Sequence, residues 1–174
     1  SDKATRFIRF CDAFNIPMLT IADVPGYLPG SNQEWGGIIR HGAKLLWCYS
    51  EATVPKLLLI TRKDYGGSYI AMCSRHLGAD MAFAWPTAEI AVMGPKQMAG
   101  VMTIVQRSAT ERRGEKFDEE ANAKRVEAVE HWAEERSKGL FATSRVADDG
   151  MIDPRDTRDV LGIALSACHN GPVA

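Results

Sequence analysis

The fold is decided by residues 56–72, which read Lys56-Leu57-Leu58-Leu59-Ile60-Thr61-Arg62-Lys63-Asp64-Tyr65-Gly66-Gly67-Ser68-Tyr69-Ile70-Ala71-Met72. The apolar run that follows Pro55 has the length and composition of a buried strand. Two glycines then interrupt the pattern, and the small and apolar residues after them predict the start of a helix. The stretch therefore predicts a strand, a tight turn and a helix in direct succession.

The turn is a candidate binding site because the first N–H groups of a helix have no acceptor inside it. The helix dipole adds partial positive charge at the same end, and anions bind there readily. We expect Gly66 and Gly67 to adopt positive φ, so that the N–H groups of Gly67 and Ser68 can hold a developing oxyanion. The alternative is a plain glycine-rich turn, because the spacing matches no Walker A loop, dinucleotide-binding loop or nucleophile elbow.

The composition is ordinary for a globular protein. The chain has 174 residues, of which 45% are hydrophobic and 25% charged, and this favours one domain with a proper core. With 21 basic and 22 acidic residues, we expect neither nucleic acid nor a membrane as a partner. We recognise no signal sequence and no apolar run of membrane-spanning length. The first residue is Ser1, which fits a processed chain or a piece of a longer protein.

The cysteines and two histidines are assigned structural roles. Cys11, Cys48, Cys73 and Cys168 lie far apart among apolar neighbours, which indicates buried thiols in a reducing cytoplasm rather than disulfides or a zinc site. We therefore expect a cytoplasmic protein with no metal. His41 in a helix and His76 at a helix end are interpreted as surface or structural histidines rather than catalytic ones.

Hydrophobic periodicity and turn residues divide the rest of the chain into helices and strands. We predict helices over residues 2–14, 35–52, 96–107, 118–138 and 153–169, and strands over residues 17–22, 81–85 and 88–93. Two Pro-Gly pairs predict a loop over residues 23–34, which carries an exposed aromatic residue and has the length of a functional loop. The alternation favours an α/β fold whose sheet is covered by helices.

Two of these helices carry specific expectations. In the helix at 35–52, we expect Ile39, Ala43, Leu46 and either Cys48 or Tyr49 to face the core. The helix at 118–138 is long and highly charged, and its Trp132 suggests a neighbouring subunit.

The chain resembles the C-terminal part of the carboxyltransferase β subunit of biotin-dependent acyl-CoA carboxylases, the family of acetyl-, propionyl- and methylcrotonyl-CoA carboxylases. The matching segments are RFIRFCDAFNIP (6–17), DVPGYLPG (23–30), GGIIRHGAKL (36–45), EATVPK (51–56), TRKDYGGSY (61–69), HLGAD (76–80), AWPTA (84–88) and AVMG (91–94). They cover nearly the whole chain and are highly specific together. Residues 149–158 resemble the methylcrotonyl- and acetyl-CoA type more than the propionyl-CoA type.

The resemblance implies an α/β, crotonase-like domain of stacked ββα units that lacks its first strands. Residues 1–174 would form part of a C-terminal carboxyltransferase domain, with the N-terminal one absent. In that family, one oxyanion site holds the ureido oxygen of carboxybiotin, and another, in a partner subunit, holds the thioester oxygen of acyl-CoA. Carried over, the first site is the backbone of Gly67 and Ser68, and Gly66 and Tyr69 complete the biotin-binding turn. Ile70 is a candidate wall of the acyl pocket, although core packing explains it equally well.

The resemblance also implies the cofactor, the substrate and the partners. Biotin would arrive as carboxybiotin on a separate carrier, acyl-CoA would be the substrate, and the partners would be a biotin carboxylase, a biotin carrier subunit and further copies of the chain, typically in a hexamer. Biotin would also supply the base, which suits a sequence without a Ser/His/Asp set or paired carboxylates. We expect this chain to supply only the biotin-side half of the active site and to be inactive alone. A decarboxylase or transcarboxylase subunit and a non-catalytic oligomerisation module are the alternatives.

Overall fold

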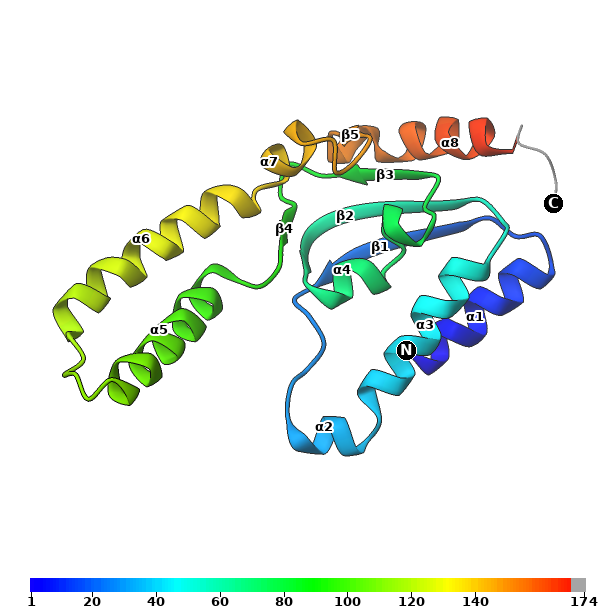
Figure 1. The fold of residues 1–174 in the computed structure, drawn as a ribbon. Helices are drawn as coiled ribbons and strands as arrows, with labels where there is room; N and C mark the ends of the chain where they lie inside the picture. Colours follow the sequence, from blue (N-terminus) through cyan, green and yellow to red (C-terminus); the bar gives the residue numbers. More distant parts are fainter. Residues whose placement is uncertain (170–174) are drawn as a thin grey trace.

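The computed structural model describes residues 1–169 (Figure 1). The helices are α1 (Asp2–Ala13), α2 (Ser31–Trp35), α3 (Ile38–Glu51), α4 (Gly67–Ala71), α5 (Pro95–Arg112), α6 (Glu119–Ser137), α7 (Gly139–Ser144) and α8 (Thr157–Cys168), with 3-10 turns η1 (Arg75–Leu77) and η2 (Pro154–Asp156). The strands are β1 (Met18–Val24), β2 (Lys56–Tyr65), β3 (Met81–Ala84), β4 (Glu89–Ala91) and β5 (Gly150–Met151). The predicted α/β class is confirmed.

Strand β2 is the centre of a parallel sheet with the strand order β1-β2-β3-β5. Along one edge, the first half of β2 pairs with β3, from Leu57 to Ile60, and the second half pairs with β4, from Lys63 to Tyr65. Along the other edge it pairs with β1. The strand thus continues through four polar residues beyond its apolar run and delivers Tyr65 directly to the glycines.

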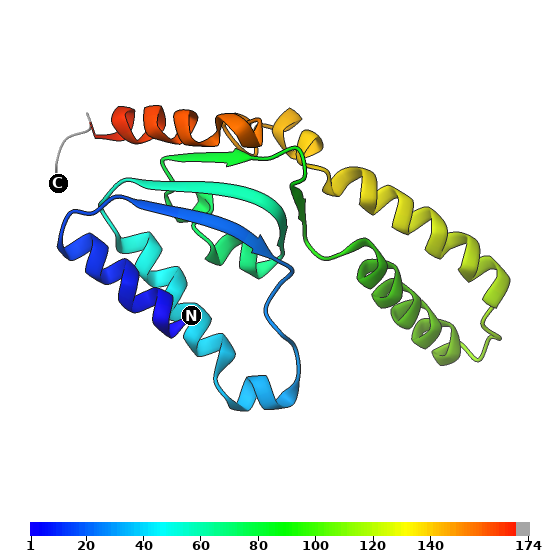
Figure 2. The same ribbon diagram turned by 180° about the vertical axis from the view of Figure 1, so that it is seen from behind.

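Helices cover both faces of the sheet (Figures 1 and 2). On one face, α4 packs through Tyr69 and Met72 on a cluster that contains Leu58 and Ile60. On the other, Leu161 and Ala164 of α8 pack against Leu57, Leu59 and Phe83. The four apolar residues of β2 are at most 1% exposed, and burial of each such side chain contributes about 1.5–3 kcal/mol. The sheet centre is therefore a rigid base for the turn that follows it.

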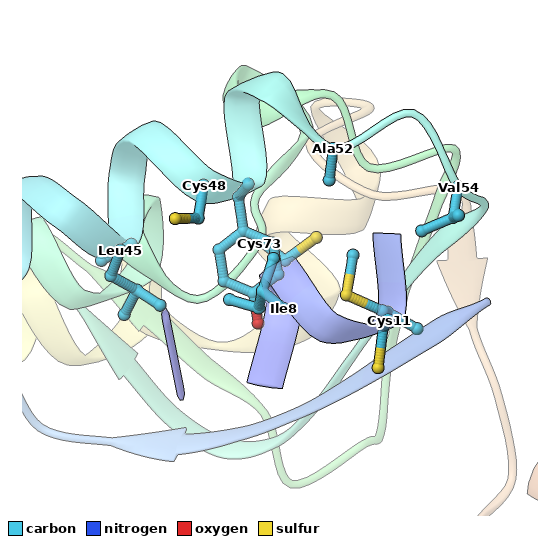
Figure 3. Close-up of a cluster of buried hydrophobic side chains, with 10 residues drawn as sticks. Ile8, Cys11, Leu45, Cys48, Ala52, Val54 and Cys73 are labelled. Atoms are coloured by element: carbon cyan, nitrogen blue, oxygen red, sulfur yellow. The ribbon is translucent and has the colours of Figure 1, made fainter. Parts of the chain in front are cut away.

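Helices α1 and α3 form a third core cluster with β1, and this cluster contains three of the cysteines (Figure 3). Cys11, Cys48 and Cys73 are buried free thiols, as predicted, whereas Cys168 is only half-buried. Burial raises the pKa of the Cys73 thiol to about 11, so it stays protonated. At the entry to β2, the ammonium of the buried Lys56 donates to the carbonyls of Tyr49 (2.9 Å) and Ala52 (2.7 Å) at the end of α3.

Helices α5 and α6 form an arm that extends away from the sheet (Figures 1 and 2). Helix α5 runs to Arg112, five residues further than predicted, and α6 is capped by Asp118, whose carboxylate accepts from the N–H of Ala121 at 3.0 Å. The chain enters the arm after β4 and returns to the sheet through α7.

Several predicted boundaries differ from the structure. The loop at 23–34 contains the short helix α2, and α3 begins at Ile38 rather than at residue 35, because Gly37 adopts a φ of +81° and breaks the helix. The predicted strand at 88–93 is only three residues long. The final helix begins with one 3-10 turn, in which Asp153 accepts from the N–H of Arg155 at 2.8 Å.

Candidate functional site

The turn between β2 and α4, which we call the glycine turn (residues 65–68), has an unusual backbone at one glycine only. Gly66 has φ of +61° and ψ of −132°, and its N–H donates to the carbonyl of Ala91 at 2.8 Å. A Cβ at Gly66 would lie 2.7 Å from the carbonyl oxygen of Val92, so only glycine fits. Gly67 does not share the positive φ that we expected, because it is already the first residue of α4. One glycine makes the bend, and the other starts the helix.

The two predicted donors lie side by side at the start of α4. Gly67 and Ser68 are its first two residues, so their N–H groups have no acceptor within the helix. Within the described chain, no side chain caps this helix. The Ser68 side chain is buried and donates to the carbonyl of Tyr65 at 2.5 Å, which holds the turn closed from inside. These contacts fix the direction of the two N–H groups without using them.

An apolar cavity of about 270 Å³ lies against Gly67. It is lined by Tyr27, Ile38, Ile39, Gly42, Ala43, Leu46 and Gly67. The Tyr27 ring comes within 3.8 Å of the position that a Cβ would take at Gly67, and its hydroxyl within 2.9 Å of the same position at Gly42. Two glycines on different helices therefore accommodate one aromatic ring, and this ring forms a wall beside the unused N–H groups.

This cavity corrects the predicted face of α3. Ile39 and Ala43, which we expected in the core, are exposed, and with the half-buried Leu46 they line the cavity. The core face of α3 consists of Gly42, Leu45, Cys48 and Tyr49, of which Cys48 and Tyr49 were the predicted alternatives. Tyr27 is the exposed aromatic residue expected in the loop at 23–34; it is 38% exposed and lines the cavity, although no specific role was predicted for it.

The loop that carries Tyr27 is anchored to β2 next to the glycine turn. Asp23 accepts two hydrogen bonds from Arg62, at 3.0 Å and 3.1 Å, and one from the N–H of Lys63 at 3.2 Å. The Arg62 guanidinium holds the pKa of the Asp23 carboxyl below its usual value. On the other side of β2, the hydroxyl of Tyr65 donates to Glu89, and burial together with this bond raises the Tyr65 pKa. The last segment of β2 is thus held by hydrogen bonds on both of its sides.

The two residues after the donors point in different directions. Tyr69 is half-buried, packs on the sheet and meets the ring of His76 edge-on at 6.2 Å between centroids. Ile70 is 40% exposed and is absent from the lining of the apolar cavity. The predicted biotin-side residues Gly66, Gly67 and Ser68 therefore lie together, with Ile70 and the Tyr69 side chain outside the cavity.

Other candidate features lie apart from this cavity. His41 bonds to the carboxylate of Asp2 at 2.8 Å on the surface. A more polar cavity of about 400 Å³, lined in part by Tyr65, Glu89 and Lys138, separates the end of β2 from the arm. Within residues 1–169, no group of three or more His, Cys, Asp or Glu side chains is arranged for a metal ion. In the same range no helix has the length and apolar character needed to cross a membrane.

Comparison with known proteins finds matches over nearly the whole chain. The sequence profile of the carboxyl transferase domain matches residues 1–174. The chain is 55% identical over 166 residues to the methylmalonyl-CoA decarboxylase subunit alpha of Veillonella parvula, covering 95% of this chain and 30% of that protein. It is 53% identical over 161 residues to the propionyl-CoA carboxylase carboxyltransferase subunit of Haloferax mediterranei, covering 92% and 30%. The chain thus spans about a third of the length of these relatives.

The fold has close counterparts among solved structures. The transcarboxylase 12S structure, described as a hexamer with hydrolysed methylmalonyl-coenzyme A bound, superimposes with a TM-score of 0.84 at 46% identity and covers 99% of this chain and 32% of its own. The sheet and helices described above are therefore those of a crotonase-like carboxyltransferase domain. The chain belongs to the carboxyltransferase family that includes the β subunits of the acyl-CoA carboxylases.

Proposed function

We propose that this chain supplies the biotin-side half of a carboxyltransferase active site, with the backbone N–H groups of Gly67 and Ser68 as the oxyanion donors. The observation that carries the proposal is the glycine turn, where the first two N–H groups of α4 have no acceptor within the helix and Gly67 lines an apolar cavity. Hydrogen-bond donors that are already oriented toward developing charge are the strongest common catalytic device, and one such donor is worth about 3–4 kcal/mol.

The residues present fit the ureido ring of biotin. The ring needs N–H donors for its oxygen and apolar walls for its flat hydrocarbon part, and the cavity offers Gly67 beside Tyr27, Ile39 and Leu46. When bound, carboxybiotin would supply the carboxyl group and, after its loss, the base. The Tyr27 ring, which lies beside Gly67, would exclude water from one side of the bound ring.

For the substrate we propose a short acyl-CoA. Support comes from the names of the relatives at 53–55% identity, which are methylmalonyl-CoA and propionyl-CoA enzymes. This choice departs from the likeness of residues 149–158 to the methylcrotonyl- and acetyl-CoA type. The relatives include a carboxylase and a decarboxylase at similar identity, so the proposal covers the half-reaction that these enzymes share. A biotin carrier, and in a carboxylase also a biotin carboxylase, would be its partners in the cytoplasm.

We propose further that the chain assembles with copies of itself and that the acyl-CoA side of the active site lies outside it. Support for assembly comes from the arm, where Val101, Ile104 and Val105 of α5 and Trp132 of α6 are exposed, and from Leu19 and Ile21 on the open face of β1. Light scattering should find an oligomer, and this chain alone should not transfer carboxyl groups from malonyl-CoA to free biotin. A monomer would contradict the first part, and turnover would contradict the second.

A binding experiment tests the biotin side directly. Amide resonances of the 174-residue chain, labelled with ¹⁵N, are followed as biotin is added. We expect the largest shifts at Gly67 and Ser68. The matched control is 2-iminobiotin, in which an imino nitrogen replaces the ureido oxygen, and it should leave these two amides unchanged. Equal shifts with both ligands, or shifts elsewhere only, would refute the donor assignment.

A substitution tests the same donors in catalysis. Gly67 occupies the first helical position, where proline fits the backbone but has no N–H. In the complete enzyme, Gly67→Pro should slow carboxyl transfer by about 100-fold or more, the usual effect of losing one oxyanion donor. Gly67→Ala keeps the N–H and is the control. Equal activity of the two variants would contradict the proposal.

A further inference from the structure

Asp64 is a buried acid with no partner, one residue before the glycine turn. Its side chain is 0% exposed, and within residues 1–169 neither of its carboxyl oxygens has a hydrogen-bond partner. A buried carboxylate without compensation is strongly disfavoured relative to the neutral acid. The last position but one of β2 thus carries a polar group that serves neither the sheet nor the core.

The surroundings of Asp64 explain why it prefers to be neutral. In the sheet its neighbours are Val24 of β1 and Ile90 of β4, which are both apolar. From α4 it faces Tyr69, whose pKa is raised first by burial and then by the charges of Asp64 and Asp148, against a lowering effect of Arg75. Burial alone raises the pKa of Asp64 to about 7, with no contribution from a charged neighbour.

Two other acidic groups at this end of β2 are compensated. Asp23 is paired with Arg62 at 3.0 Å, and Glu89 accepts from the hydroxyl of Tyr65. The buried carboxyl of Asp148, which also acts on Tyr69, is compensated only in part: one oxygen accepts from the hydroxyl of Thr143 at 3.0 Å, the other has no partner within residues 1–169, and burial raises its pKa. Asp64 differs from Asp148 in that neither of its oxygens has a partner within the same range and that it directly precedes the glycine turn in the chain.

We propose that Asp64 is a proton-controlled positioning residue of the glycine turn, which supports oxyanion binding at Gly67 and Ser68 when neutral and opposes it when ionised. Three peptide units separate Asp64 from Gly67, so their Cα atoms are at most about 11 Å apart. At an effective dielectric constant of about 20, a negative charge about 10 Å from another shifts its equilibrium by roughly tenfold. The ionised acid would also attract the same helix N–H groups that the ligand needs. The inference about catalysis rests on the proposed function of the turn.

The test begins on the 174-residue chain without any ligand. The ¹³C shift of the Asp64 carboxyl and the amide shifts of Gly67 and Ser68 are recorded between pH 5 and 9. We expect all three to titrate together with a midpoint near 7. In Asp64→Asn, and in Asp64→Ser as a second uncharged variant, the two amides should no longer move. Asp159→Asn, an equal charge change at an exposed site of α8 on the other face of the sheet, should leave the titration unchanged.

The results of these experiments distinguish the role of Asp64 from the proposed function of the turn. Amides that do not move in this range, or that move equally in Asp64→Asn, overturn the inference, as does a carboxyl that titrates near 4. In the complete enzyme, the ratio of wild-type to Asp64→Asn carboxyl transfer should fall about tenfold between pH 6 and pH 8.5, and a constant ratio would overturn the effect on catalysis. A wild-type enzyme without biotin-dependent transfer would refute the proposed function instead, while the amide titration still decides the role of Asp64.

Discussion

Replacing Gly66 by alanine tests the backbone geometry on which the candidate site depends. The glycine has φ of +61° and ψ of −132°, and an added Cβ would lie 2.7 Å from the carbonyl oxygen of Val92. Holding an L residue in such a conformation costs about 1–3 kcal/mol. Moving it away from Val92 breaks the bond from its N–H to the carbonyl of Ala91, worth about 1 kcal/mol. We therefore expect Gly66→Ala to lower the free energy of unfolding by roughly 2–4 kcal/mol.

The next residue supplies the matched control. A Cβ at Gly67 would meet the Tyr27 ring at 3.8 Å, an ordinary van der Waals contact, and Gly67 lacks the positive φ of its neighbour. Gly67→Ala should therefore change the free energy of unfolding by less than about 1 kcal/mol. Urea denaturation of both variants of the 174-residue chain measures the difference. Similar stabilities would show that the turn relaxes around a side chain at Gly66, and the argument for a fixed donor geometry would fail.

Three further predictions concern side chains around the turn. Ser68→Ala removes the hydrogen bond to the Tyr65 carbonyl and should lower stability by about 1 kcal/mol in urea denaturation, with carboxyl transfer within a few-fold of wild type, because the N–H remains; a loss as large as that of Gly67→Pro would contradict it. Ile70→Asp should change the order of kcat/KM among acyl-CoAs of different length, since an apolar wall discriminates by about 1–3 kcal/mol per methylene; an unchanged order rejects that role. The pKa of Asp64 is about 7 in the folded chain against 3.8 for an unperturbed aspartate, so the stability that the neutral acid contributes is complete below pH 3.8 and is lost as the pH rises to 7. Between pH 4.5 and pH 8 the free energy of unfolding should therefore fall by up to about 3 kcal/mol more in the wild type than in Asp64→Asn.

The strand and the turn could be predicted from the sequence because their signals are local. Four consecutive apolar residues and a Gly-Gly pair determine a buried strand and its end, whatever surrounds them. The continuation of β2 to Tyr65 is not local, because residues 63–65 pair with β4 and Asp64 also pairs with Val24 of β1. For the same reason the sequence could not tell which of the two glycines bends the chain, since the contact with Val92 decides it.

The apolar cavity could not be predicted because core and cavity walls have the same composition. Ile39 and Leu46 follow the periodicity of a buried face, and only the three-dimensional arrangement shows that they line a cavity beside Gly67. Tyr27 contacts Gly42 and Gly67, which are 15 and 40 positions further along the chain, so no local pattern connects them. The state of Asp64 could not be predicted for a related reason. The sequence shows an aspartate, but not that its carboxyl oxygens lack hydrogen-bond partners within residues 1–169.

Strand β4 is connected both to the glycine turn and to the helical arm, so that a movement of the arm can be transmitted to the turn. Its last residue, Ala91, accepts the N–H of Gly66, and the next residue, Val92, presents the carbonyl that faces the same glycine. Only Val92, Met93 and Gly94 separate this strand from the start of α5. A rotation of the arm must be absorbed within those three residues, or it pulls on the backbone that aims the N–H groups of Gly67 and Ser68. Forces applied at the far end of the arm are thereby mechanically linked to the turn.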